Sequence, residues 1–157
     1  RVDANTAWTP EQTIYFSTAL KDLGVEFIEQ PLKADDWAGM KKVFEQSALP
    51  IIADESCILE EDVEKCVGYF HGVNIKLMKC GGITPALRMI KKAKSFGLKV
   101  MVGCMISTSL SMAPAILVAQ GADWSDLDGP ADMAQDRDHP VTYDDRHIHP
   151  ASPLLWG

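Results

Sequence analysis

Three acidic residues close short apolar stretches of this chain at almost equal intervals. Asp3 ends the stretch in RVDAN, Glu29 in FIEQP and Asp54 in IIADES, so 26 and then 25 residues separate them. One strand-helix unit of a parallel barrel has a similar length, and the C-terminal ends of all its strands meet at one face. We therefore expect the three carboxylates to converge at that face.

Converging carboxylates repel one another unless a cation lies between them. Because every ligand would be an oxygen atom, a hard divalent ion such as Mg2+ fits best. Taken singly, each of these acidic residues is explained more simply as a turn or helix-cap carboxylate. The coincidence of three in consecutive units favours a magnesium site.

A lysine lies on the next predicted strand. Lys76 stands within VNIKLM, 22 residues after Asp54, where burial is costly for a charge that is neither paired nor functional. Lys79 follows three positions later and so cannot share a face with Lys76 on an extended strand. We predict that Lys76 is a general base beside the metal, with its pKa lowered by neighbouring positive charge.

Two further pairs of polar residues have alternate spacing. Asp126 and Asp128 in SDLDG have the same strand parity, so both could face a cationic substrate group, although a solvated turn explains them equally well. His147 and His149 form an HxH pair that could coordinate a metal. Alternate positions in a polar strand or loop are the simpler interpretation.

Capping signals mark the helices that must position these residues. Thr9 and Gln12 form a predicted capping box around Pro10, and Gly24 ends that helix. Further helices are expected at 36–46, 60–70 and 84–97, with an apolar one ending at residue 121. The predicted strands lie at 1–5, 25–31, 49–56, 72–82, 98–105 and 123–129.

The predicted strands are nearly continuously apolar, as expected for a parallel sheet buried on both faces. Repeated βα units give a closed barrel or an open doubly wound sheet; no GxGxxG follows the first strand, so a dinucleotide-binding fold has no support. We assign residues 1–130 to the barrel. Residues 131–157, rich in Asp, His and Pro, form a tail that leaves it. Because the chain opens directly on a ligand-bearing strand, we expect it to be the C-terminal part of a longer protein.

The composition is that of an enzyme-like globular chain. It has 157 residues, is 46% hydrophobic and carries a net charge of −7, which argues against nucleic acid and anionic membranes as partners. No apolar run reaches the roughly 18 residues of a membrane span. The four cysteines show neither a CxxC pair nor metal-ligand spacing, so we expect reduced thiols in a cytoplasmic protein.

The motifs DAN, EQP, ADES and IKLMKCGGI, in this order and spacing, resemble the muconate-lactonizing subgroup of the enolase superfamily. Within it, the chain is most similar to the dipeptide epimerases. The resemblance implies an α/β fold, a (β/α)7β TIM-like barrel, with about six of eight strands in this chain and a tail that packs on a capping domain. It also implies an isomerase that inverts the α-carbon of a dipeptide's C-terminal residue through a magnesium-stabilised enediolate. The partners expected are the dipeptide and further copies of the same protein.

The resemblance also assigns roles to residues. It makes Asp3, Glu29 and Asp54 ligands of Mg2+ and Lys76 one of two catalytic lysines. The SDLDG segment resembles the DxD with which dipeptide epimerases hold the substrate's α-ammonium group. The resemblance therefore implies a substrate-binding set that consists of Asp126, Asp128, Cys104, Met105, Ser107 and Asn5.

One feature of the family lies outside this chain, which leaves alternatives open. The second catalytic lysine belongs to a KxK motif upstream of the first metal ligand, so an N-terminal part of the protein is needed to complete the site. Related reactions are those of o-succinylbenzoate synthase, N-acylamino acid racemase and cycloisomerase, whose substrates lack the free ammonium group that a DxD would hold. A different class is an inactive metal-binding or interface fragment, which the missing lysine favours for the isolated chain.

Overall fold

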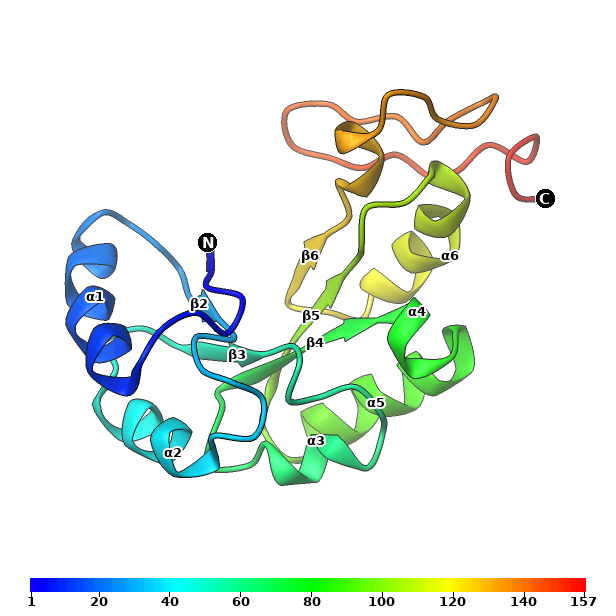
Figure 1. Cartoon of the computed structure of the whole chain (residues 1–157). Helices are drawn as coiled ribbons and strands as arrows, with labels where there is room; N and C mark the ends of the chain where they lie inside the picture. The colour runs from blue at the N-terminus through cyan, green and yellow to red at the C-terminus, as the bar shows by residue number, and fades with distance from the viewer.

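A six-stranded parallel sheet with helices on its outer side forms the body of the protein (Figure 1). The computed structural model describes all 157 residues. Each strand pairs with the next in chain order, so β1 and β6 are the two edges of a half-barrel. The strands are β1 (Val2–Asp3), β2 (Ile28–Glu29), β3 (Ile51–Ala53), β4 (Gly72–Lys76), β5 (Lys99–Gly103) and β6 (Trp124–Asp126). The prediction of six parallel strands is confirmed.

Side-chain caps fix the starts of the first two helices close to where the sequence places them. Thr9 and Gln12 form the expected capping box at the start of the first helix, and Asp36 caps the second through the Gly39 N–H. The helices are α1 (Pro10–Asp22), α2 (Trp37–Gln46), α3 (Asp62–Lys65), α4 (Leu77–Cys80), α5 (Ile83–Ser95) and α6 (Ser109–Ala119), followed by a 3-10 turn at Gly129–Asp132. None of them combines the length and apolar composition that a membrane crossing requires.

The observed strands are shorter than the predicted ones, and two predicted elements differ further. The helix expected at 60–70 is only the single turn α3, because Gly68 adopts a left-handed φ of 78° that a helix cannot continue through. The strand expected at 72–82 ends at Lys76, and the chain continues as α4. This second difference changes which side chains reach the site.

The strands separate two apolar layers. Residues that face outward from β2 to β5, such as Ile51, Val73 and Val100, pack beneath the helices in the main core. Inward-facing residues form a smaller cluster of Phe27, Ile52 and Met101, with Trp124 packed against it. Apolar side chains therefore fill part of the inner face of the half-barrel.

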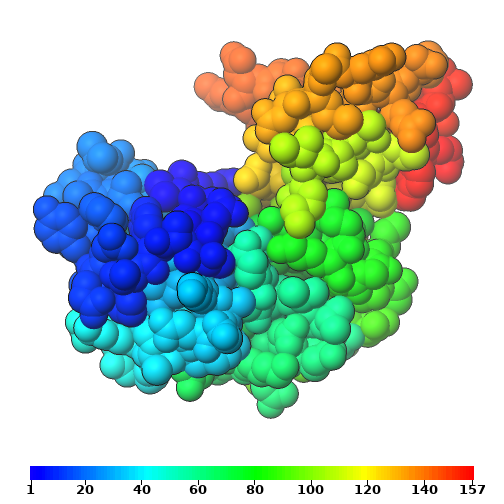
Figure 2. Space-filling model, in the orientation of Figure 1, coloured from blue at the N-terminus to red at the C-terminus, as the bar shows by residue number.

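The two edge strands approach each other across the open side. The Arg1 guanidinium at the start of β1 donates a hydrogen bond to the Ser125 carbonyl of β6 at 2.9 Å, and it lies 5.5 Å from the centroid of the Phe27 ring. Above this contact a wide hollow separates the N-terminal and C-terminal parts of the surface (Figure 2). The tail after the 3-10 turn lies beyond α6, as the orange and red trace shows (Figure 1).

Candidate active site at the C-terminal ends of the strands

The sheet register directs the predicted site residues to one side of the strands. Asp3 pairs with Glu29, so both side chains leave neighbouring parallel strands in the same direction. Glu29 in turn pairs with Ile52, and Asp54 stands two residues beyond that partner. Glu29 and Asp54 are buried, whereas Asp3 is exposed because it lies on the edge strand β1.

Asp54 is held by two lysines. The Lys76 ammonium lies 2.9 Å from one oxygen of the carboxylate and the Lys79 ammonium lies 2.8 Å from the other. The prediction that Lys79 points away from Lys76 is wrong, because the strand ends at Lys76 and the next residues turn into α4, where positions three apart lie on one face. The side chains of Lys76 and Lys79 are only 10% and 15% exposed, so the two cations compensate a buried anion.

The ion pair sets the protonation of Lys76. Burial alone would lower the pKa of its ammonium, but the hydrogen bond and charge of Asp54, with the charges of Glu29 and Asp3, raise the pKa above its ordinary value. With Asp54 as its partner, Lys76 therefore favours its protonated form. The lowering of its pKa that metal and lysine charge would cause stays a prediction.

Glu29 shows the opposite effect. Burial, with the charges of Asp3 and Asp54, raises the pKa of Glu29 to about 7, against the lowering effects of a hydrogen bond from Asn74 and the charge of Lys76. Asn74 lies on β4, and its amide donates that hydrogen bond over 2.6 Å, across the intervening strand β3. A buried carboxylate beside two others is therefore a site that positive charge would stabilise.

A residue that sequence reasoning missed ties these strand ends together. Gln30 is fully buried, and its amide donates to the Leu32 carbonyl and the Ser56 hydroxyl, while its oxygen accepts the N–H groups of Asp54 and Ser56. All four hydrogen-bonding positions of the amide are thus used. Its φ of 30° is unusual for a residue other than glycine. Gln30 thus fixes the backbone of the loop that begins at Asp54. In the sequence, the only signal for this role is its place directly after Glu29, a candidate metal ligand.

The donor set fits a hard cation, although the ligands do not form a closed group. No three His, Cys, Asp or Glu side chains lie close enough together to hold a metal ion as they stand. Glu29 and Asp54 are nevertheless buried carboxylates close enough for their charges to interact, and the two ammonium groups on Asp54 already supply cationic charge there. Carboxylate oxygens are the donors that Mg2+ prefers, and Glu29 has no cation paired with it in the chain.

Asp126 and Asp128 lie on the far side of the hollow, at the end of β6. The strand ends at Asp126, so their equal strand parity no longer applies, yet burial and the neighbouring Asp128 carboxylate raise the pKa of Asp126. Two adjacent carboxylates that repel each other favour a cationic partner. Both residues are exposed, and neither forms an ion pair within the chain.

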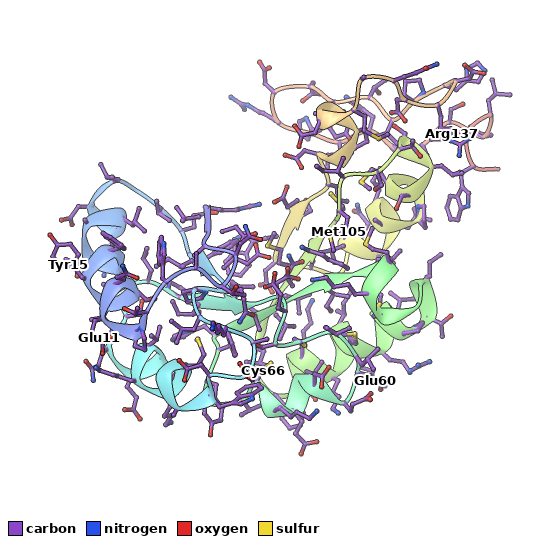
Figure 3. The ribbon with its side chains drawn as sticks, viewed as in Figure 1. Glu11, Tyr15, Glu60, Cys66, Met105 and Arg137 are labelled. Carbon is purple, nitrogen blue, oxygen red and sulfur yellow. The ribbon has the colours of Figure 1, made fainter.

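The loop after β5 supplies the remaining predicted pocket residues. Cys104 and Ser107 are half-buried and Met105 is 46% exposed. Figure 3 places Met105 beside the hollow, whereas Glu11 and Tyr15 lie on α1, away from it. Asn5 donates its backbone N–H to Asp3 at 2.8 Å, and no hydrogen bond joins its exposed side chain to the other site residues.

Comparison with known proteins gives the class to which this half-barrel belongs. Residues 1–153 match the enolase C-terminal domain-like family, and the chain is a member of that family. It is 62% identical over 129 residues to an L-Ala-D/L-amino acid epimerase from a Maribacter species, covering 82% of this chain and 38% of that protein. It is also 43% identical over 156 residues to an N-acetyl-D-glutamate racemase from a Pseudoalteromonas species, covering 99% of this chain and 49% of the relative.

Solved structures agree with these relatives. An enolase family member from Agrobacterium tumefaciens with homology to dipeptide epimerases, bound to sodium and L-Ala-L-Glu, superposes with a TM-score of 0.93 at 42% identity, over 99% of this chain and 48% of that one. A dipeptide epimerase from Cytophaga hutchinsonii, complexed with Mg and D-Ala-L-Val, gives a TM-score of 0.86 at 30% identity, over 94% and 42%. The chain therefore spans less than half the length of each of these proteins.

Proposed function

We propose that the whole protein containing this chain is a magnesium-dependent dipeptide epimerase, with Lys76 as one of its two acid/base lysines. The observation that carries the proposal is the Lys76 ammonium 2.9 Å from Asp54, with the charge of the buried Glu29 nearby, at the C-terminal ends of parallel strands. The relatives named above as epimerases support the reaction class.

The chemistry requires both positive charge and a base. Removing the proton α to a carboxylate places a second negative charge on that group, and a bound Mg2+ would supply the charge that stabilises it. Asp3, Glu29 and Asp54 are the residues that would hold the ion. Lys76 takes or returns the α-proton at its Nζ atom, as lysines do in the enolase superfamily generally. Epimerisation then needs a second acid/base group on the opposite side of the α-carbon, outside this chain.

In this proposal, residues of β6 and of the loop after β5 orient the substrate. Asp126 and Asp128 bind the dipeptide's α-ammonium group as a cation between two carboxylates, and Cys104, Met105, Ser107 and Asn5 contact the rest of the substrate. Residues 131–157 extend from the barrel to a capping domain contributed by the remainder of the protein. The anchoring of this tail on α6, through Asp136 and Ser109, supports the direction in which it leaves.

The test is α-proton exchange. The whole protein is mixed with Mg2+ and a dipeptide library in deuterated water, and mass spectrometry reports which dipeptides gain one deuterium at the α-carbon. Exchange in one subset establishes the chemistry and the side-chain preference. No exchange in any dipeptide, with Mg2+ demonstrably bound, contradicts the proposal.

A second candidate is racemisation of an N-acylamino acid, which the similarity to an N-acetyl-D-glutamate racemase favours. Such a substrate has no free ammonium group, so Asp126 and Asp128 would have no cation to bind. N-acetylated amino acids are therefore included in the same exchange experiment. Exchange in these compounds, without exchange in dipeptides, would assign this second reaction.

A further inference from the structure

A buried amide lies beside the Glu29 carboxylate, and this carboxylate is the only hydrogen-bonding partner of the amide. Asn74 is 1% exposed, and its Nδ2 donates a hydrogen bond of 2.6 Å to Glu29 Oε1. The two residues lie on strands that are separated by one other strand of the sheet. The bond from Asn74 is the sole hydrogen bond that the carboxylate accepts. One oxygen of Glu29 is thereby fixed, and the other is left free of protein donors.

The second half of the same amide is unsatisfied. Asn74 Oδ1 is buried and accepts no hydrogen bond. A buried polar atom without a partner is destabilising, and an apolar side chain of equal size would avoid that cost. Packing alone therefore does not account for asparagine at this position, whereas the hydrogen bond to Glu29 does.

The neighbouring strand leaves room for the amide. A Cβ atom at Gly103 would lie 2.6 Å from Asn74 Oδ1 and 2.7 Å from its Nδ2, closer than any real contact. Gly103 is not among the glycines with a positive φ, so its backbone conformation does not require glycine. The space taken by the Asn74 side chain is what excludes a larger residue there.

We propose that Asn74 is a positioning residue for Glu29, and that Gly103 provides the space in which its amide is held. Resting on the proposed metal site, the inference is that the amide directs the free Glu29 oxygen toward the bound cation. Asn74 itself touches neither the metal nor the substrate. Replacing Asn74 should therefore lower the affinity for the metal and leave the rate of the chemical step unchanged.

The experiment measures the Mn2+ affinity of the whole protein by electron paramagnetic resonance. Melting temperatures recorded in EDTA show whether each variant is folded without the metal. Asn74→Leu removes the donor at similar volume, and Gly103→Ala displaces it. Both variants are expected to weaken Mn2+ binding by about 10-fold to 100-fold. The double variant is expected to bind no more weakly than either single one, because both remove the same interaction.

Matched controls separate positioning from general damage. Met101→Leu changes the inward-facing partner of Asn74 in β5 without touching the hydrogen bond. Gly121→Ala adds a methyl group where the nearest atom is 3.5 Å away. Both controls are expected to bind Mn2+ as the wild type does. Raising the metal concentration is expected to restore the activity of Asn74→Leu.

Three outcomes would overturn the inference: wild-type affinity in Asn74→Leu, wild-type affinity in Gly103→Ala, or losses that multiply in the double variant. If Asn74→Leu does not fold, Gly103→Ala decides alone. A wild-type protein that binds Mn2+ but exchanges no substrate proton contradicts the proposed function, and the affinities still decide the role of Asn74. If the wild-type protein binds no Mn2+, both the proposed function and the role of Asn74 are contradicted.

Discussion

The Lys79 ammonium lies 2.8 Å from Asp54, on the carboxylate that also binds Lys76. The two lysines are brought together because the chain changes from strand to helix directly after Lys76. Asp54 therefore has a cation on each oxygen, and a residue that the sequence pattern directs elsewhere becomes part of the site. The different roles of the two lysines can be tested separately.

Replacing Lys76 is expected to abolish proton exchange from one stereoisomer of the substrate. Lys76→Ala in the whole protein removes the acid/base group on one side of the α-carbon, where such groups contribute about 10²-fold to 10⁴-fold to the rate. Deuterium incorporation is followed separately from each stereoisomer, with Lys91→Ala on the exposed side of α5 as the control. Full epimerase activity in Lys76→Ala would rule out its assignment.

Replacing Lys79 is expected to slow exchange from both stereoisomers without abolishing either. Lys79→Met keeps the apolar stem but removes one of the two cations on Asp54, while Lys76 remains as the base. We expect a loss of roughly 10-fold, corresponding to a charge-assisted hydrogen bond, and partial recovery in Lys79→Arg. Complete loss of exchange from only one stereoisomer would instead make Lys79 the acid/base residue.

Magnesium is expected to stabilise the folded protein against heat. A ligand that binds only the folded state adds about 2.7 kcal/mol at a concentration 100 times its dissociation constant. Calorimetry with Mg2+ and with EDTA measures this difference in melting temperature. Glu29→Gln is expected to remove most of it, whereas Glu45→Gln on the surface of α2 should leave it intact. An equal magnesium effect in both variants would exclude Glu29 as a ligand.

The tail is expected to depend on Asp136. Its carboxylate accepts the N–H of Ser109 at 2.8 Å and the Ser109 hydroxyl, at the first turn of α6. Asp136→Ala leaves these buried donors unpaired, and we expect a loss of about 1–2 kcal/mol in the free energy of unfolding. Denaturant titration measures it, with the exposed Asp138→Ala as control. Equal stability of the two variants would show that the tail is not anchored there.

Ionisation of Tyr143 is expected to weaken the attachment of the tail slightly, and only at high pH. Burial raises its pKa to about 12, and its hydroxyl donates to the Leu127 carbonyl at 2.8 Å, between Asp126 and Asp128. Because the neutral form is favoured in the folded state, the stabilisation is complete below the ordinary pKa near 10 and is lost as the pH rises through 12. Since the ring is 40% exposed, the gain is only about 0.5 kcal/mol.

Absorbance titration checks this prediction, because the chain has three tyrosines and one should ionise late. Tyr143→Phe should lack that late step. The step persisting in the variant would assign it to another tyrosine.

The sequence by itself determined the features that depend on short-range geometry. Equal spacing of Asp3, Glu29 and Asp54 and near-continuous apolar strands predicted a parallel barrel edge with carboxylates at one end. The capping box of Thr9 and Gln12 predicted where α1 begins, because a cap involves residues only three positions apart. Strand parity likewise places alternate residues on one face, and the register agrees with it.

Only the tertiary structure decided which polar groups meet. Asn74 reaches Glu29 across β3, Gln30 fixes the start of the Asp54 loop, and Asp136 anchors a tail on α6. These contacts join residues about 25 to 45 positions apart, and their partners depend on sheet curvature and register, which no local pattern contains. The position of Lys79 also depends on the tertiary structure. Parity excludes it from the site, and the turn into α4 places it there, because periodicity follows the backbone conformation that the fold selects.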